Sequence, residues 1–151
     1  MLANQLMSQP IITCHVNDAL NVPAQRMWDH DCGAVAVVND EGTLVGMVTD
    51  RDICMAAYTQ GLSLEAMLVN CAMSRHVVAT HANQPIEDVE RLMAEHKIRR
   101  VPVIDSVGRP IGIVSLHDVA RECAQPGAKQ AQQQVATTLA AICTPRAPAR
   151  S

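Results

Sequence analysis

Residues 45–53 read Val-Gly-Met-Val-Thr-Asp-Arg-Asp-Ile, and residues 111–119 repeat the pattern as Ile-Gly-Ile-Val-Ser-Leu-His-Asp-Val. Each copy is a β-branched strand that contains a Gly, followed by Thr or Ser. An Asp comes three residues later, where a helix is expected to begin. The chain is therefore organised around a strand-to-helix junction that occurs twice, 66 residues apart.

The repeat extends well beyond this junction. Residues 7–56 align with residues 73–122 without a gap, and 12 of the 50 pairs are identical. Unrelated sequences of ordinary composition would agree at roughly three such positions. The chain therefore contains two copies of one supersecondary unit. Because so small a unit buries little apolar surface alone, we expect the copies to pack together.

Composition limits the classes of function. The 151 residues are 48% hydrophobic, and the only aromatic side chains are Trp28 and Tyr58. The net charge is −3 and the isoelectric point is near 6.0. Base-stacking aromatics and a basic face are both missing, so nucleic acid is not expected as a partner.

The sequence carries no sign of export or of a metal site. The six Cys form no Cys-x-x-Cys pair, no secretory leader is visible at the N-terminus, and no apolar run is long enough to span a membrane. We therefore expect a cytoplasmic protein with reduced thiols that does not bind membranes. Cys32 is replaced by Ile98 in the second copy, so no ligand set for a metal recurs and none is expected.

Hydrophobic periodicity and turn residues predict the order β-α-β-β-α in each copy. For the first copy we expect strands at 11–13, 34–38 and 43–48, with helices at 18–30 and 50–60. For the second copy we expect strands at 77–78, 101–104 and 110–114, with helices at 84–96 and from 116. Short helical turns are expected at 3–7, 64–67 and 69–73.

The expected fold class is therefore α/β (α+β), with three segments. Residues 1–68 hold the first unit with its lead-in and connector, 69–124 the second unit, and 125–151 an Ala/Gln-rich tail. The tail has apolar residues at helical spacing (Val135, Leu139, Ile142), whereas 144–151 are expected to be disordered. Two interpretations of the tail remain open, packing on a partner subunit and a half-ordered extension.

The repeated Thr/Ser-x-x-Asp has a structural and a functional interpretation. In the first, Thr49 and Ser115 cap the following helix, and Asp52 and Asp118 complete a capping box. In the second, the carboxylate accepts both hydroxyls of a ribose, and the helix start with its hydroxyl binds phosphate. A ligand can displace a cap, so the two interpretations are compatible.

Three motifs together resemble a tandem pair of CBS (cystathionine β-synthase) domains, also called a Bateman module. They are the repeated Gly-x-Val-(Thr/Ser)-x-x-Asp, the strand Val101-Pro102-Val103-Ile104 before a Gly turn, and the Met-Ser that opens each unit. The resemblance covers roughly residues 5–124, and its motifs look like those of the small stand-alone bacterial members and of the pair inserted in IMP dehydrogenase. It implies two units related by a pseudo-twofold axis, with clefts between their sheets, and a homodimer of such pairs.

The resemblance also implies a function. Family members commonly bind AMP, ADP, ATP, S-adenosylmethionine or NAD-like ligands and serve as sensors. It implies that Asp52 and Asp118 hold the ribose and that Thr49 and Ser115 hold phosphate. The further residues that it assigns to the nucleotide are Ile12, Thr13, Val78 and Ala79 beside the adenine, and Arg99 and Arg100 at the phosphates.

The two copies depart from the family pattern in different ways. Thr13 corresponds to Ala79, and the pair Arg99-Arg100 corresponds to Gly33-Ala34. The two clefts are therefore expected to be unequal, with one of them either empty or occupied by a different ligand.

We expect a non-catalytic regulatory module that needs no cofactor and acts on a separate, unknown client protein. A structural dimerisation module with empty clefts is the alternative. An enzyme is not expected, because no Gly-rich phosphate loop, nucleophile elbow or zinc-hydrolase motif is present.

Overall fold

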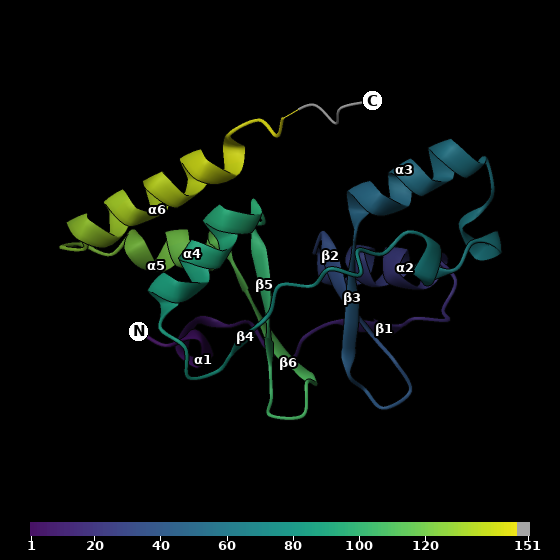
Figure 1. Cartoon of the computed structure of the whole chain (residues 1–151), viewed down its shortest axis with the longest axis horizontal. Coiled ribbons are helices and arrows are strands. Elements are labelled where there is room, and N and C mark those ends of the chain that lie inside the picture. The colour runs from purple at the N-terminus through teal and green to yellow at the C-terminus, as the bar shows by residue number, and fades with distance from the viewer. Residues whose placement is uncertain (148–151) are drawn as a thin grey trace. The chain divides into compact units, whose positions relative to one another are not determined.

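The computed structural model describes residues 1–147, and each copy has the predicted order β-α-β-β-α (Figure 1). The first copy consists of β1 (Thr13–His15), α2 (Asn21–His30), β2 (Ala34–Val38), β3 (Leu44–Thr49) and α3 (Asp50–Gln60). The second consists of β4 (Thr80–His81), α4 (Ile86–His96), β5 (Arg100–Ile104), β6 (Pro110–Ser115) and α5 (Leu116–Cys123). The remaining elements are α1 (Ala3–Leu6), the short 3₁₀ helices η1 (Leu64–Ala66) and η2 (Val69–Cys71), and α6 (Lys129–Cys143).

The strands form two three-stranded sheets within residues 1–147, in the orders β1-β2-β3 and β4-β5-β6. In the first sheet β1 is parallel to β2, with Thr13 opposite Ala36, and β3 is antiparallel to β2, with Thr49 opposite Ala34. This register brings the end of β3 beside the start of β2. The predicted mixed α/β class is confirmed.

The duplication recurs as matching hydrogen bonds. The backbone N–H of Asp50 donates to the Gly33 carbonyl at 3.1 Å, and the N–H of Leu116 donates to the Arg99 carbonyl at 2.8 Å. In the hairpin turns, Asn39 Oδ1 accepts from the Thr43 N–H at 2.9 Å, as Asp105 Oδ1 does from the Arg109 N–H. The turn glycines, Gly42 and Gly108, both have positive φ, a conformation that glycine adopts without steric cost.

The chain divides into two compact units that do not coincide with the halves of the sequence. The first-copy unit contains residues 9–77 and 104–112, and the second-copy unit contains residues 1–8, 78–103 and 113–147. The lead-in of each copy, which is the short segment before its first strand, pairs with the sheet of the other copy. The N–H of Ser8 donates to the Ile113 carbonyl on β6, and that of Ser74 donates to the Met47 carbonyl on β3, both at 2.8 Å. The boundaries expected from sequence at 68 and 124 stay a prediction.

Four elements begin more than one residue later than predicted: β1, β4, α2 and α4, the last at Ile86 rather than at residue 84. The strands expected at 11–13 and 77–78 begin at Thr13 and Thr80. Before Thr13, the Ile12 carbonyl still accepts a hydrogen bond from the Ala36 N–H of β2 at 3.1 Å. The helix expected to begin at residue 18 begins instead at Asn21, with Leu20 in the N-cap position. Asp18 accepts from the backbone N–H of His15 at 2.8 Å, so it stabilises the turn before the helix.

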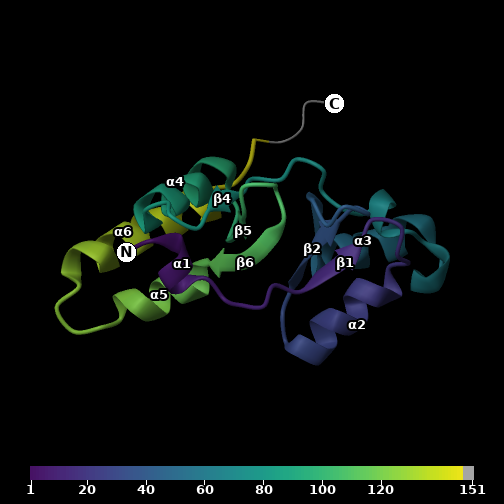
Figure 2. The ribbon, with the colours of Figure 1, turned by 90° about the horizontal axis from the view of Figure 1, so that it is seen from below.

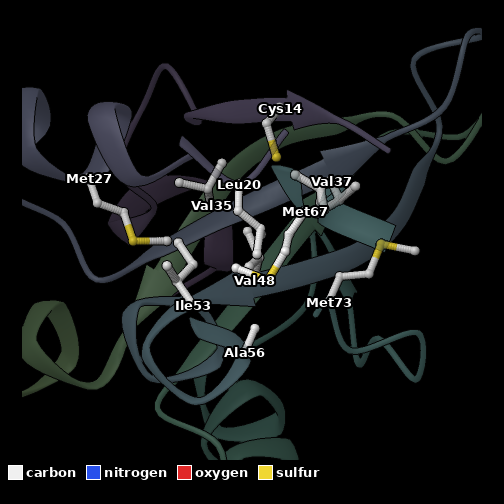
Figure 3. Packing of buried hydrophobic residues seen from close by; sticks show 11 residues of the cluster. Cys14, Leu20, Met27, Val35, Val37, Val48, Ile53, Ala56, Met67 and Met73 are labelled. Atoms are coloured by element: carbon white, nitrogen blue, oxygen red, sulfur yellow. The ribbon is translucent and has the colours of Figure 1, made fainter. Parts of the chain in front are cut away.

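The core of the first-copy unit is aliphatic and sulfur-rich, as the near absence of aromatic residues requires (Figure 3). Leu20 and Met27 from the α2 region pack with Val35, Val37 and Val48 from β2 and β3. Ile53 and Ala56 on α3 close the cluster. The buried face of α3 thereby fixes the orientation of its first turn, which carries Asp52.

The Ala/Gln-rich tail forms α6, which packs on α4 and α5 of its own unit (Figures 1 and 2). Thr138 and Ile142 are buried, whereas Leu139 is 44% exposed. The helix predicted in the tail is confirmed, and its partner is a helix pair of the same unit. Of the segment expected to be disordered, 148–151 lies outside the described residues.

Candidate nucleotide-binding site at the repeated helix start

In the first copy, Thr49 and Asp52 form a reciprocal capping box at the start of α3. The N–H of Asp52 donates to Thr49 Oγ1 at 3.1 Å, and the N–H of Thr49 donates to Asp52 Oδ2 at 2.9 Å. Asp52 is half-buried, and its hydrogen bond within the described chain engages Oδ2. The second oxygen, Oδ1, is available for another donor.

In the second copy the same box is occupied more fully. The N–H and Oγ of Ser115 both donate to Asp118 Oδ2, at 3.0 and 2.6 Å, and the Asp118 N–H donates to Ser115 Oγ at 3.2 Å. Arg121, one turn further along α5, donates to Asp118 Oδ1 at 2.6 Å. Asp118 is only 6% exposed, so a ligand there has to displace Arg121 or bind beside it.

The capping interpretation is therefore confirmed in both copies, and the ligand interpretation stays open. Asp52 keeps a free carboxylate oxygen, whereas Asp118 uses both oxygens for internal partners. Sequence reasoning did not single out Arg121. Its signal was the spacing Asp118-x-x-Arg121 on a predicted helix, which places the two side chains on one face.

The residues expected to line the adenine in the first copy, Ile12 and Thr13, are half-buried at the start of β1. The guanidinium of Arg26 on α2 donates to the Thr13 carbonyl. Sequence reasoning missed this arginine, whose counterpart in the second copy is Leu92. The neighbouring thiol of Cys14 is buried, and this burial, with the charge of Asp18, raises its pKa to about 12, while Arg26 acts in the opposite direction. Cys14 is thus a neutral core thiol rather than a nucleophile.

In the second copy, Val78 and Ala79 are half-buried and lie just before β4. Arg99 is exposed, and its carbonyl accepts the Leu116 N–H, so its backbone lies beside the first turn of α5. Arg100 is half-buried and begins β5. The fold therefore brings the backbone of this basic pair next to the Ser115–Asp118 box.

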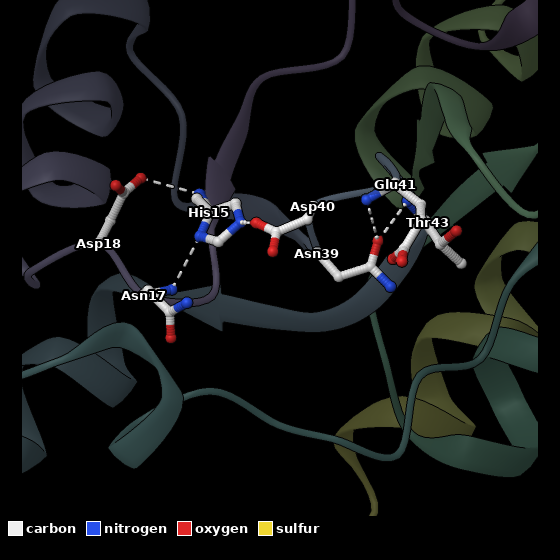
Figure 4. A network of polar contacts seen from close by, with 7 residues as sticks. All are labelled: His15, Asn17, Asp18, Asn39, Asp40, Glu41 and Thr43. Carbon is white, nitrogen blue, oxygen red and sulfur yellow. Dashed lines mark hydrogen bonds and ion pairs between the residues drawn. The ribbon is translucent and has the colours of Figure 1, made fainter.

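His15 and His30 recur in the second copy as His81 and His96, and all four are the last residues of their strand or helix. His15 Nδ1 accepts the Asn17 N–H at 3.1 Å, and its Nε2 lies 2.6 Å from Asp40 Oδ1 in the hairpin turn (Figure 4). His30 and His96 are the last residues of α2 and α4. Each of these helices ends in a residue with left-handed backbone, Asp31 or Lys97.

Within residues 1–147 no group of three or more His, Cys, Asp or Glu side chains is placed to hold a metal ion. The six cysteines of this segment are free thiols. Among the described helices, none has the length and apolarity needed to cross a bilayer.

Comparison with known proteins supplies the family. The family model for the CBS domain matches residues 3–58 and again residues 69–125. CBS domain-containing protein YhcV of Bacillus subtilis is 38% identical over 114 residues, which are 76% of this chain and 79% of that protein. Hypoxic response protein 1 of Mycobacterium tuberculosis is 32% identical over 145 residues, which cover 96% of both chains.

Solved structures agree. The crystal structure of Hypoxic Response Protein I with two coordinated zinc ions superposes with a TM-score of 0.74 at 32% identity, covering 83% of this chain and all of that one. A CBS domain pair in complex with 5′-methylthioadenosine and S-adenosyl-L-methionine gives a TM-score of 0.74 at 30% identity, covering 81% of this chain and 94% of that chain. With two family matches on its two structural copies, the chain belongs to the CBS-domain family and is a tandem CBS pair.

Proposed function

We propose that the protein is a non-catalytic regulatory module that binds an adenosine-containing nucleotide. The observation that carries the proposal is the repeated helix start, where a Thr or Ser and an Asp surround the free N–H groups of α3 and α5. A carboxylate in this position suits the two hydroxyls of a ribose, and the positive end of the helix dipole suits phosphate.

The relatives support this ligand class. CBS pairs are regulatory modules, and a CBS pair of the same fold at 30% identity was solved with 5′-methylthioadenosine and S-adenosyl-L-methionine. We carry to this chain the shared adenosyl part of those ligands. The candidates are AMP, ADP and ATP, then S-adenosylmethionine and NAD.

The two helix starts are not equivalent, and we assign the stronger ribose site to Asp52. Its Oδ1 can accept a ribose hydroxyl while Oδ2 keeps the cap intact. At Asp118 the ribose competes with Arg121, which is 2.6 Å away. Ile12 and Thr13 belong to the same unit as Asp52, and we propose that they contact the adenine. In the other unit, Val78 and Ala79 take this role. Arg99 and Arg100 of that unit are proposed to meet phosphate.

The first test is a thermal-shift panel on protein freed of co-purified ligand, with AMP, ADP, ATP, S-adenosylmethionine, 5′-methylthioadenosine, NAD and GTP. A ligand present at 100 times its Kd adds about 2.7 kcal/mol to the free energy of unfolding. For a chain of this size the melting temperature then rises by roughly 5–10 °C. A panel without any shift supports the alternative, a structural dimerisation module.

Titration calorimetry on variants then locates the site. Asp52→Asn keeps an acceptor for the cap but removes the charge and one ribose acceptor, and we expect at least a tenfold loss of affinity. Asp118→Asn should cost less, and Asp29→Asn, an exposed carboxylate on α2, is the matched control. Equal affinities in the Asp52→Asn and Asp29→Asn variants would show that the box is only a helix cap.

We propose further that the protein acts as a homodimer and regulates a separate client. Trp28 and Tyr58 on α2 and α3 are 87% and 83% exposed, although they are the two aromatic residues of the chain. Exposed aromatic side chains of this kind are enriched at protein interfaces. Sedimentation of the wild type and of a Trp28→Ala/Tyr58→Ala variant tests this, and a monomeric wild type at micromolar concentration contradicts it.

A further inference from the structure

The second-copy unit contains a cavity of about 630 Å³ that no part of the proposed nucleotide site uses. Its walls come from α1, α4, α5, the chain leading into α6 and the first turns of α6 itself, with Ile86, Val119 and Ala131 among the apolar lining residues. A volume of this size is typical of small-molecule sites, which range over roughly 300–1,000 Å³.

A buried carboxyl group lines this cavity. Glu90 on α4 is 4% exposed, and within the described residues its Oε1 is buried without a hydrogen-bond partner. Burial, and after it the charge of Glu87, raise the pKa of Glu90, while the nearby Thr138 hydroxyl on α6 acts in the opposite direction. Leaving a buried carboxylate oxygen unpaired costs free energy, so such an atom requires an explanation.

The duplication shows that the fold does not require this acid. Glu90 corresponds to Ala24 in the first copy, and Ala24 lines a groove between α2 and α3. Two further pairs line both hollows, Ile53 with Val119 and Ala57 with Cys123. The same position of the same supersecondary unit is thus apolar in one copy and acidic in the other, which favours a role for Glu90 beyond packing.

The charge of the lining points to a cation. Glu87, Glu90 and Glu122 lie at the cavity, and the described lining contains no Lys or Arg, so the three carboxylates outnumber its one cationic group, the α-ammonium of Met1. A metal ion is a poor match, since residues 1–147 contain no cluster of three suitable ligands. Apolar walls and glutamine amides surround the acids, a combination that suits an ammonium group on an aliphatic chain.

We propose that the cavity beneath α6 binds an organic cation, an aliphatic amine whose ammonium group pairs with Glu90. The amine supplies the donor that Glu90 Oε1 lacks, Glu87 and Glu122 add long-range attraction, and the methylene chain lies against Val119 and Ala131. This site is independent of the proposed nucleotide function, because it uses none of its side chains.

The test is calorimetric titration of the full chain with spermidine and with 1,4-diaminobutane at pH 7.5 and 150 mM salt. Saturable binding of one amine per chain is expected, whereas 1,4-butanediol, of the same length without charge, should not bind. Glu90→Gln keeps the shape and removes the charge, and a loss of affinity of at least tenfold is expected. Glu95→Gln, on the exposed side of the same helix, is the matched control and should bind as the wild type does.

A second measurement does not depend on the variant. Cys123 lines the cavity and Cys143 is exposed on α6, so bound amine should slow alkylation of Cys123 at least threefold and leave Cys143 unchanged. Equal amine affinity in the Glu90→Gln and Glu95→Gln variants overturns the proposal. So does alkylation of Cys123 at the same rate with amine and with diol.

Discussion

The helix pairs α2/α3 and α4/α5 occupy equivalent positions in the two copies, yet their outer faces differ. The second pair is covered by α6, and it carries Ala94 and Ala124 where the first pair carries Trp28 and Tyr58. The first pair leaves both aromatic side chains more than four-fifths exposed. One helix pair is thus covered by a helix of its own chain, whereas the other presents two exposed aromatic side chains.

The features that stayed alike teach the complementary lesson. Both copies keep the reciprocal capping box and the hairpin glycine. These features depend on residues within four positions of one another, so a substitution in one of them directly destabilises the cap or turn of its own copy. Helix faces, by contrast, can diverge wherever a new covering element compensates.

Loss of the α6 contact should give the largest effect. Ile142→Ala removes a side chain on the buried face of α6 that is 9% exposed, and we expect a loss of about 2–3 kcal/mol in the free energy of unfolding. Leu139→Ala, on the exposed side of the same helix, should cost less than half as much. Urea unfolding measures both, and equal costs would mean that α6 does not cover the α4/α5 pair in solution.

The exchange of lead-ins between the copies gives a second prediction. A Cβ added at Gly46 would lie 2.7 Å from Met73 Sδ and 2.9 Å from the Ser74 carbonyl, so the lead-in must move. Gly46→Ala should destabilise the chain by about 1–3 kcal/mol. An unchanged denaturation midpoint would contradict the pairing of Ser74 with β3.

The two caps should rank by their hydrogen bonds. Thr49→Ala and Ser115→Ala each remove one cap, which costs about 1 kcal/mol. Ser115→Ala should cost slightly more, because Ser115 Oγ also donates to Asp118 whereas no such bond links Thr49 Oγ1 to Asp52 among the described contacts. Thermal unfolding of the two variants ranks them, and a larger loss for Thr49→Ala would reverse this comparison.

The acid in the second groove predicts a pH dependence that the first groove lacks. Because folding raises the pKa of Glu90 above its ordinary value of 4.5, its contribution to stability is present below that value and lost as the pH rises through the folded pKa. The melting temperature of the wild type, relative to Glu90→Gln, should therefore fall as the pH rises above 4.5. If the difference in melting temperature between the two proteins did not change with pH, folding would not raise the pKa of Glu90.

The exposed aromatic surface should show the smallest effect on the isolated chain. Trp28→Ala gives the first copy the residue that the second copy has at the matching position. Because Trp28 is 87% exposed, the free energy of unfolding should stay within about 0.5 kcal/mol of the wild type at low protein concentration. At higher concentration the loss should grow, because the proposed dimer buries Trp28 in its interface; a difference that is the same at every concentration would contradict that interface.

Much of the fold could be read from local sequence. The repeat register predicted the order of elements in both copies. The helix expected at 50–60 has these bounds in the structure, and Gly61 follows it in the left-handed conformation that glycine favours. The capping boxes at Thr49 and Ser115 were predictable because all their atoms lie within one helical turn.

The sequence by itself determined the duplication, the β-α-β-β-α order and the two capped helix starts. Only the tertiary structure decided which sheet each lead-in joins, that α6 covers α4 and α5, and that Glu90 is buried with an unpaired oxygen. Local hydrogen bonds connect residues three or four apart, so they leave a pattern in the sequence. Burial and pairing between segments that are distant in the sequence leave no such local pattern, because they arise from surfaces that meet only in the folded chain.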